Sequence, residues 1–459
     1  MKFINRTEEL GFLERKFSSK EPELIIIYGR RRIGKTELLM RFSEAKPAMY
    51  FMGRLESRED TIKRFNNLLI EHFKDSRLLN NPLPNWDTIF TYLAENADKK
   101  TILIIDEFPL LVERFPELLS TLQDKLDSEL SRSRILLILS GSSVGMMEKY
   151  ALDYKSPLYG RRTGQWEVSK MSLPHLHEFF PKYSMEDIVR LYSCIDAIPG
   201  YLSKFSPDEG IMGNIRDRML SKGEFLYEEV EILLREEFRD PSNYMSIISS
   251  VAGGLNTFNE LYNKTRLDKS LLSKYLHTLE RLGIVRRSVP VTESYKGALR
   301  SRGALYSLCD NFFGFWFRFV YLNKQELEKG RAADVLKSSE RDFEHYVSGK
   351  FESFATELIS LGAVGNFDRA GRWWHKENEI DIVALNEDKK RILFCECKWK
   401  EGVDAGKVLE ELKEKAKLVD WKSGKREESF AVFAKSFKRK TRGAGCFDLK
   451  DMEKILKKS

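Results

Sequence analysis

The feature that most constrains this chain is a glycine-bounded loop directly after a short apolar run. Leu24 to Ile27 are apolar, and residues 29–36 read Gly-Arg-Arg-Arg-Ile-Gly-Lys-Thr. A strand that runs into such a loop and then into a helix is the context in which this pattern binds phosphates. Gly29 and Gly34 let backbone N–H groups turn inward around a phosphate, and the helix N-terminus adds partial positive charge there. The loop therefore predicts a site for ATP or GTP.

Side chains at the end of this loop have separate expected roles. Lys35 is expected to reach the β- and γ-phosphates, and the Thr36 hydroxyl is expected to bind Mg²⁺. The neighbouring residues expected to contact the nucleotide are Arg32, Ile33 and Glu37. No Asn-Lys-x-Asp motif, which would recognise guanine, follows the apolar run at residues 135–140. Its absence from the sequence favours ATP over GTP.

Three further apolar runs alternate with helical stretches. They are residues 48–52, 101–107 and 135–140. Near-continuous apolar runs are typical of parallel strands that are buried on both faces. The pattern predicts an α/β fold with a parallel sheet and right-handed connections.

Polar residues end two of these runs. Asp106 is expected to hold the hydration shell of Mg²⁺ opposite Thr36, and Glu107 to orient or deprotonate the attacking water. The alternative for Asp106 is that it only caps the next turn. Ser140 is expected to sense the γ-phosphate or the water, and the alternative is a helix N-cap in this serine-rich turn.

Length and composition set wider limits. The chain has 459 residues, of which 42% are hydrophobic, and at about 150 residues per domain we expect roughly three domains. No run of 18 apolar residues occurs, so no membrane span is expected. The five cysteines are few and scattered, which favours a reducing, cytoplasmic setting over a disulfide framework.

A basic segment in the middle of the chain predicts a winged helix-turn-helix. The whole chain has a net charge of +7, and residues 245–302 alone contain ten basic and four acidic residues. Thr257 and Glu260 have the spacing of a capping box at a helix start. A second helix is expected from about 268 until Gly283 stops it. Two short strand-like runs, 284–289 and 304–308, then predict a hairpin.

The second of these helices is expected to enter the major groove of DNA, and the wing to meet phosphates. The residues expected at this interface are Lys269, Ser270, Ser273, Lys274 and His277 on the helix, and Arg286, Arg287 and Lys296 on the wing. Winged helices also serve as packing or protein-contact domains, so both readings stay open here. The aromatic run 311–320 that follows is expected to be a buried helix rather than a base-stacking surface.

Charged residues near the end of the chain suggest a second magnesium chemistry. Asp381 lies in one strand-like run, and Glu396 and Lys398 lie two residues apart, hence on one face, in the next. Asp381 and Glu396 are expected to hold Mg²⁺, and Lys398 to orient the water or stabilise the developing charge, as in PD-(D/E)xK nucleases. Glu352 on an expected upstream helix, 346–361, is a further candidate ligand. The alternative is an amphipathic strand with ordinary charged pairs.

The motifs around the phosphate loop resemble the archaeal ATPase family, a P-loop group related to AAA+ proteins and to signal-transducing ATPases with numerous domains. The segments that carry the resemblance are Phe3-Ile4-Asn5-Arg6, the phosphate loop, residues 105–109, Gly141-Ser142-Ser143 and residues 158–164. The resemblance implies that Asn5 and Arg6 lie near the adenine. It also implies that Arg161 or Arg162 approaches the phosphates, as a sensor or as a finger supplied to a neighbouring copy. From the residues alone, this arginine pair is equally compatible with surface charge.

The order of motifs after residue 324 looks like the domain of unknown function that follows this ATPase module. That domain of unknown function is itself similar to restriction-endonuclease-like folds. We therefore predict a P-loop ATPase core (1–170), a helical lid (171–240), a winged helix-turn-helix (241–323) and a nuclease-like domain (324–459).

The expected function is ATP hydrolysis, with Mg²⁺, coupled to DNA binding and to DNA cleavage. Two alternatives stay open: an ATP-switched DNA-binding regulator with an inactive nuclease fold, and a nucleotide-switched recruiter of protein partners. A homo-oligomer is compatible with each of them.

Overall fold

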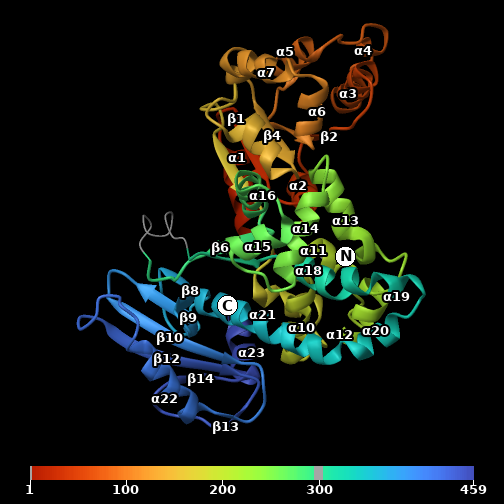
Figure 1. The fold of residues 1–459 in the computed structure, drawn as a ribbon. Helices are drawn as coiled ribbons and strands as arrows, with labels where there is room; N and C mark the ends of the chain where they lie inside the picture. The colour runs from red at the N-terminus through yellow and green to blue at the C-terminus, as the bar shows by residue number, and fades with distance from the viewer. Residues whose placement is uncertain (1–2, 294–302, 459) are drawn as a thin grey trace. The chain divides into compact units, whose positions relative to one another are not determined.

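The computed structural model describes residues 3–293 and 303–458 and divides into two compact units, Met1–Lys170 and Met171–Ser459. Each unit has its own five-stranded sheet among these residues (Figure 1). Lys296, which was predicted to contact DNA from the wing, lies outside the described residues. None of the described helices is long and apolar enough to cross a membrane.

The sheet of the N-terminal unit is parallel throughout, with strand order β2-β3-β4-β1-β5. Its strands are β1 (Glu23–Tyr28), β2 (Ala48–Met52), β3 (Thr101–Asp106), β4 (Ile135–Gly141) and β5 (Gly164–Glu167). The first four confirm the predicted runs. The fifth was not predicted, because Trp166 is the single large apolar residue in its four positions. Since the strands are parallel, their carboxyl ends lie at one edge of the sheet, where the phosphate loop follows β1.

Helices cover both faces of this sheet (Figure 1). Alternate residues of the strands pack into two hydrophobic cores. Leu13 and Phe42 of the helices belong to one core, and Phe65 and Trp86 belong to the other. The principal helices are α1 (Thr7–Ser18), α2 (Lys35–Ser43), α3 (Arg58–Phe73), α4 (Arg77–Asn80), α5 (Trp86–Asn96), α6 (Phe108–Arg114), α7 (Leu118–Asp127) and α8 (Val144–Met147). Each fully buried large side chain contributes about 1.5–3 kcal/mol, so the two cores give the phosphate loop a rigid base.

The C-terminal unit opens with a helical region, as predicted for residues 171–240. Its helices are α9 (Leu176–Phe179), α10 (Met185–Ile195), α11 (Pro199–Leu202), α12 (Ile211–Asn214) and α13 (Phe225–Glu237). Pro199 starts the short helix α11. Proline suits the first position of a helix, where its missing N–H has no intrahelical partner to lose.

The helix-turn-helix and its hairpin follow. The elements are α14 (Ser242–Ala252), α15 (Phe258–Thr265), α16 (Lys269–Arg281), β6 (Val285–Ser288) and β7 (Leu305–Leu308). The capping box of Thr257 and Glu260 is formed, and β6 pairs with β7 in antiparallel fashion. After β6 the wing meets the C-terminal sheet: the Val291 N–H donates to the Arg372 carbonyl at 3.0 Å.

The aromatic run is buried, as predicted. It forms α18 (Asn311–Phe315) and a π-helical turn (Trp316–Val320) that pack among α10, α13 and α14. The Trp316 Nε1–H donates to the Tyr227 carbonyl at 2.7 Å, which satisfies the one polar atom of this fully buried ring.

The last part of the unit is a mixed sheet with strand order β14-β12-β10-β9-β8. Its strands are β8 (Arg369–His375), β9 (Asn378–Asn386), β10 (Arg391–Lys398), β12 (Glu427–Ala434) and β14 (Gly445–Phe447); a short pair, β11 (Val403–Asp404) and β13 (Phe437–Arg439), lies apart. The flanking helices are α19 (Lys324–Glu328), α20 (Ala332–Ser338), α21 (Glu340–Ser360), α22 (Ala405–Ala416) and α23 (Leu449–Lys458). The strands β9 and β10 form the predicted hairpin. The helix α21 begins earlier than the predicted residue 346, and its start was missed because its first turn is polar.

Candidate functional site

The phosphate loop has a backbone that needs its glycines. Gly29 has φ +144°, and a Cβ there would lie 2.4 Å from the Val168 carbonyl oxygen. Gly34 has φ +86°, a conformation that other residues rarely adopt. Both observations agree with a loop that turns its N–H groups inward, and Gly34 leads directly into α2.

Lys35 is buried inside this loop. It is 6% exposed, and its Nζ donates to the carbonyls of Gly29 at 2.8 Å and Arg30 at 3.0 Å. Burial lowers the pKa of Lys35 to about 8, although Glu107 and Asp106 act in the opposite sense. Both of these hydrogen-bond acceptors are neutral carbonyls, so a phosphate would supply a direct charged partner.

The carboxylate of Asp106, at the end of β3, is the centre of the site. Its Oδ2 accepts from the Thr36 hydroxyl at 2.8 Å and from the Tyr50 hydroxyl at 2.7 Å, and its Oδ1 accepts from the Glu107 N–H at 3.0 Å. Thr36 and Asp106 are thus adjacent, as an Mg²⁺–nucleotide complex in this class of loop requires. The structure brings these two predicted residues together and adds Tyr50, which sequence reasoning missed.

Glu107 lies where the chain turns from β3 into α6. Its φ of +49° is left-handed, and its Oε2 accepts from the Ser142 N–H at 3.4 Å. Ser140 is adjacent to Ile27 in the sheet register and is fully buried, and its hydroxyl has no hydrogen-bond partner within the described part of the chain. An unpaired buried hydroxyl at this edge agrees with the predicted sensor role, which stays a prediction.

Residues before α1 reach the phosphate loop. The Arg6 guanidinium donates to the Ile33 carbonyl at 2.7 Å and to Glu9 at 2.8 Å. The Asn5 side chain accepts from the Thr7 N–H, so it shapes the start of α1. Ile33 is buried, whereas Arg32 and Glu37 are exposed. Arg6 is therefore hydrogen-bonded to the phosphate loop, and the expected place of Asn5 and Arg6 near the adenine stays a prediction.

The two arginines that the resemblance relates to the phosphates come shortly before β5 in the chain. Arg161 makes a paired hydrogen bond with Asp127 at 2.8 and 2.6 Å. It lines a small cavity with Glu23 and Ile135, the first residues of β1 and β4, hence at the sheet edge opposite the phosphate loop. The Arg161 guanidinium is therefore paired with a carboxylate in this structure, and its role at the phosphates stays a prediction. Arg162 donates to the Leu152 carbonyl at 3.2 Å, and a finger role toward a neighbouring copy stays a prediction.

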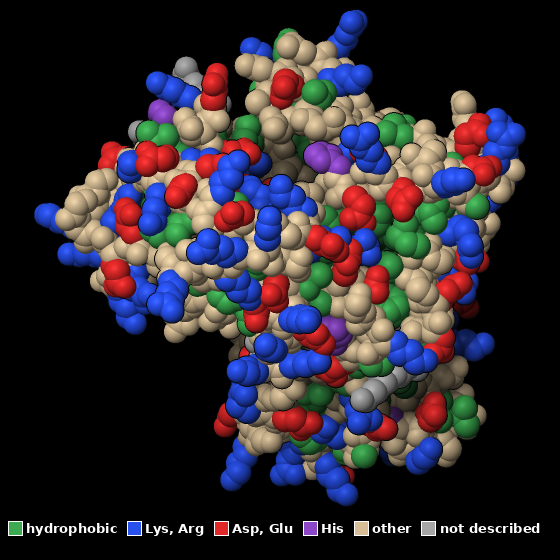
Figure 2. All heavy atoms as spheres, turned by 90° about the horizontal axis from the view of Figure 1, so that it is seen from below, with side chains coloured by type: hydrophobic (Ala, Val, Ile, Leu, Met, Phe, Trp, Pro, Cys, Tyr) green, Lys and Arg blue, Asp and Glu red, His purple; other side chains and the backbone are tan. Residues whose placement is uncertain are grey.

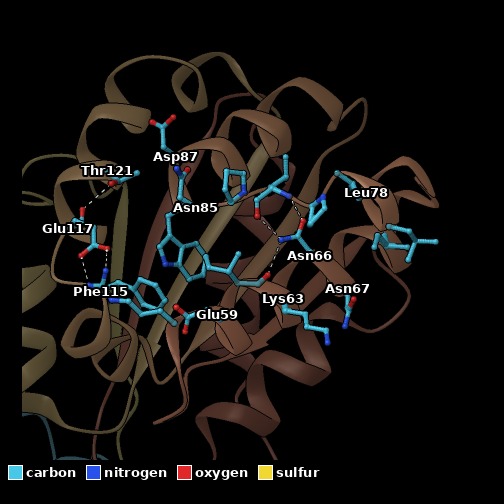
Figure 3. Close-up of a pocket in the computed structure, with 18 residues that line it drawn as sticks. Glu59, Lys63, Asn66, Asn67, Leu78, Asn85, Asp87, Phe115, Glu117 and Thr121 are labelled. Atoms are coloured by element: carbon cyan, nitrogen blue, oxygen red, sulfur yellow. Dashed lines mark hydrogen bonds and ion pairs between the residues drawn. The ribbon is translucent and has the colours of Figure 1, made fainter.

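A cavity of about 850 Å³ lies in another part of the N-terminal unit (Figure 3). It is bounded by α3, residues 82–87 and α7, and no phosphate-loop residue lines it. Asn66 fixes one wall by bonding both the N–H and the carbonyl of Leu83. The cavity is therefore separate from the nucleotide site.

The second predicted site is also assembled. Cys395 is paired with Ile382 across β9 and β10, so Glu396 and Asp381 come next on their strands. Lys398 Nζ lies 2.7 Å from Glu396 Oε2 and 4.0 Å from Asp381 Oδ2. The Cys397 N–H donates to Asp381 Oδ2 at 2.8 Å. The predicted acid, acid and lysine therefore face one another.

Two more residues adjoin this group. Lys415 from α22 was missed by sequence reasoning, and its Nζ lies 2.6 Å from Glu396 Oε1. Burial and the nearby Asp381 raise the pKa of Glu352 to about 7, and burial together with Glu396 raises the pKa of Asp381 to about 6. For Glu396, burial favours protonation, but the hydrogen bonds from the two lysines outweigh it and lower its pKa.

These carboxylates do not form a preformed metal cage. Nowhere in residues 3–293 and 303–458 do three His, Cys, Asp or Glu side chains cluster as metal ligands. Mg²⁺ usually takes one or two carboxylates together with waters and substrate phosphates. Asp381 and Glu396 fit that smaller donor set, with Lys398 and Lys415 competing for Glu396.

Most of the described residues that were predicted to contact DNA are exposed. On α16 the side chains of Lys269, Ser270, Ser273 and Lys274 are exposed, and on β6 Arg286 is exposed and Arg287 is half-buried. In the lysine-rich C-terminal segment some cations have carboxylate partners: Lys435 pairs with Glu186, and Lys457 with Glu453. On the face drawn in Figure 2, basic side chains lie among acidic ones rather than in one continuous patch.

The parallel sheet, the glycine loop with Lys35 and Thr36, and the acidic pair that ends β3 together define a P-loop ATPase domain. A family model described as an ATPase domain predominantly from Archaea matches residues 3–205. A second model, for "Archaea bacterial proteins of unknown function", matches residues 316–416.

A relative from Methanocaldococcus jannaschii, described as an uncharacterized protein, is 36% identical over 462 residues, which cover 98% of this chain and 99% of the relative. The chain therefore belongs to this family of archaeal proteins, which join an ATPase domain to a C-terminal domain of unknown function. An uncharacterized ATP-binding protein of the same organism is 59% identical over 44 residues, 10% of this chain and 75% of that protein.

Among solved structures, the Walker-type ATPase of Pyrococcus abyssi is similar in fold, with a TM-score of 0.55 and 22% identity. The match covers 69% of this chain and 96% of that one. At this level of identity the likeness concerns the fold alone, and it agrees with the expected ATPase architecture.

Proposed function

We propose that this protein hydrolyses ATP at the phosphate loop and that the nucleotide state controls DNA binding by the winged helix-turn-helix. The observation that carries the hydrolysis proposal is the contact between Thr36 and Asp106 at 2.8 Å, directly beside Glu107. This arrangement joins a metal-binding hydroxyl, a carboxylate for the metal hydration shell and a second carboxylate for the water.

Each residue has a separate task in this mechanism. The loop N–H groups and Lys35 bind the β- and γ-phosphates, and Lys35 exchanges its carbonyl partners for phosphate oxygens. Thr36 and Asp106 would hold Mg²⁺, which would supply positive charge to neutralise the charge that develops on the transferred phosphoryl group. Glu107 orients the attacking water and accepts its proton, and Ser140 is a polar group at the γ-phosphate end of the site.

The test of hydrolysis is phosphate release by the purified full-length protein. Lys35→Ala should lose nucleotide binding, whereas Glu107→Gln should bind ATP but release phosphate at least about 100-fold more slowly, as expected for loss of a general base. Glu117→Gln is the matched control, because Glu117 is exposed and pairs with Arg58 away from the loop. Equal rates in Glu107→Gln and Glu117→Gln would refute the role of Glu107.

The winged helix supports the DNA part of the proposal. Its second helix presents two lysines and two serines on an exposed face, and Arg286 extends the cationic surface to the wing. Such a face suits phosphate contacts together with base-edge contacts. The competing function is recruitment of a protein partner by the same face, and it predicts no retention of DNA even at low salt, where phosphate contacts are strongest.

A second candidate function is Mg²⁺-dependent DNA cleavage by the C-terminal site. The observation that favours it is the convergence of Asp381, Glu396 and Lys398, with Lys398 at 2.7 Å from Glu396. In such a site the two carboxylates would hold the metal, and a lysine would stabilise the charge on the phosphate. Lys415 supplies a second cation for the same purpose.

Incubation with plasmid, linear and branched DNA, with and without ATP and Mg²⁺, separates these functions. Nicking that requires Mg²⁺ and disappears in Asp381→Asn supports the nuclease, and Asp388→Asn, at an exposed turn after β9, is the control. DNA that is bound but never cut supports the ATP-switched regulator. DNA that is not bound at low salt supports the recruiter of protein partners.

A further inference from the structure

Tyr50 contacts the buried carboxylate of the nucleotide site although no motif includes it. Its hydroxyl donates to Asp106 Oδ2 at 2.7 Å, and the Thr36 hydroxyl donates to the same oxygen at 2.8 Å. The other oxygen, Oδ1, accepts from the Glu107 N–H. Asp106 is 1% exposed, so these three donors set the orientation of its carboxylate.

The fold holds Tyr50 in this place. Tyr50 lies in β2, where it is paired with Ile104 of the neighbouring strand β3. Its ring packs against the core that also contains Leu38 and Leu39 of α2, the helix that carries Thr36. The ring is therefore wedged between a strand and the helix of the phosphate loop, and its hydroxyl has little freedom to turn elsewhere.

The two hydroxyl donors differ in what happens when a metal binds. The Thr36 hydroxyl is a metal ligand in this class of loop, so one of its lone pairs would face the cation while its hydrogen can still point to Asp106. The Tyr50 hydroxyl has no such second role. Tyr50 therefore restrains Asp106 Oδ2 from a side chain that is not itself expected to bind the metal.

We propose that Tyr50 is a positioning residue for the magnesium site: it holds Asp106 in the orientation that receives the hydrated cation. Partners of this kind, one shell removed from the metal, typically change metal affinity or activity about 10–100-fold when they are removed. The inference rests on the proposed nucleotide site but not on hydrolysis, because it concerns the binding of Mg²⁺ with a bound nucleotide.

The experiment is a Mg²⁺ titration of the full-length protein with a fluorescent, non-hydrolysable ATP analogue. Tyr50→Phe removes one oxygen atom and keeps the ring. We expect its affinity for the analogue in EDTA to stay within about twofold of wild type, while the Mg²⁺ midpoint rises about tenfold. Affinity in EDTA reports that the loop is folded, so it separates a metal effect from a folding defect.

The matched control is Tyr92→Phe. The Tyr92 hydroxyl donates to Asp75 at 2.9 Å, a bond of the same kind in the same unit but among α4 and α5. The Tyr92→Phe variant should leave the Mg²⁺ midpoint unchanged. An equal midpoint in wild type, Tyr50→Phe and Tyr92→Phe would overturn the proposal.

A double-mutant cycle distinguishes positioning from a general structural role. Asp106→Asn should raise the Mg²⁺ midpoint by itself, and Tyr50→Phe should then add little, because the two residues act through one carboxylate. Additive effects would overturn the proposal. If the Mg²⁺ midpoints differ as expected but the wild-type protein releases no phosphate, hydrolysis is refuted and the role of Tyr50 stands.

Discussion

The lowered pKa of Lys35 predicts that ATP binding weakens in mildly alkaline solution. Burial brings the pKa of this ammonium to about 8 when its partners are the carbonyls of Gly29 and Arg30. A bound triphosphate favours the charged form, so it raises that pKa again. Binding above pH 8 therefore requires uptake of a proton from solution, and below pH 8 it does not.

The magnitude follows from the fraction of charged lysine. With a pKa of about 8, about 90% of free protein molecules carry a protonated Lys35 at pH 7 and about 10% do so at pH 9. If only the charged form binds, the apparent dissociation constant rises about tenfold between these pH values, which is about 1.4 kcal/mol. Proton uptake at pH 9 should approach about 0.9 per nucleotide.

Titration calorimetry in EDTA tests this, in pairs of buffers with different ionisation enthalpies. The matched variant is Lys35→Arg, whose guanidinium stays charged throughout this range, so its affinity should be flat from pH 7 to pH 9 whatever its absolute value. A wild-type affinity that is also flat, with no proton uptake at pH 9, would refute the argument that burial controls this lysine.

Three further results are expected. Gly29→Ala should weaken ATP binding more than tenfold, because its Cβ would lie 2.4 Å from the Val168 carbonyl oxygen; an unchanged affinity in a nucleotide titration would contradict this. Glu396→Gln should abolish Mg²⁺-dependent nicking yet tighten DNA binding at low salt, because the two lysines bound to it become available to phosphates; weaker retention in a filter-binding assay would count against it. Changing Lys269 and Lys274 together to Ala should lower the salt slope of DNA binding by about 2, and the same slope in wild type and variant would exclude them from the interface.

Features that repeat or cluster along the sequence were predictable. The phosphate loop and the acidic end of β3 are short patterns on strands whose apolar runs mark them clearly. The capping box of Thr257 and Glu260 and the hairpin of Asp381 with Glu396 were found for the same reason, since each depends on local spacing.

Features that depend on distant partners were not predictable. Tyr50 is 56 positions from Asp106, and Lys415 is 19 positions from Glu396, so no local pattern connects them. The pairing of Arg161 with Asp127, 34 positions away on another element, was not predictable for the same reason. The strand β5 escaped notice because polar residues and a glycine surround Trp166.

The junction between the wing and the C-terminal sheet has a geometric consequence. The Val291 N–H donates to the Arg372 carbonyl at 3.0 Å, Arg369 donates to the Glu293 carbonyl at 3.1 Å, and Val291 packs against the core of that sheet. If the proposed DNA binding and DNA cleavage both occur, this junction would fix the distance between the two sites. A duplex gripped by α16 would meet the carboxylates of β9 and β10 at one set number of base pairs from the gripped sequence, so any cuts should fall at a constant offset rather than at scattered positions.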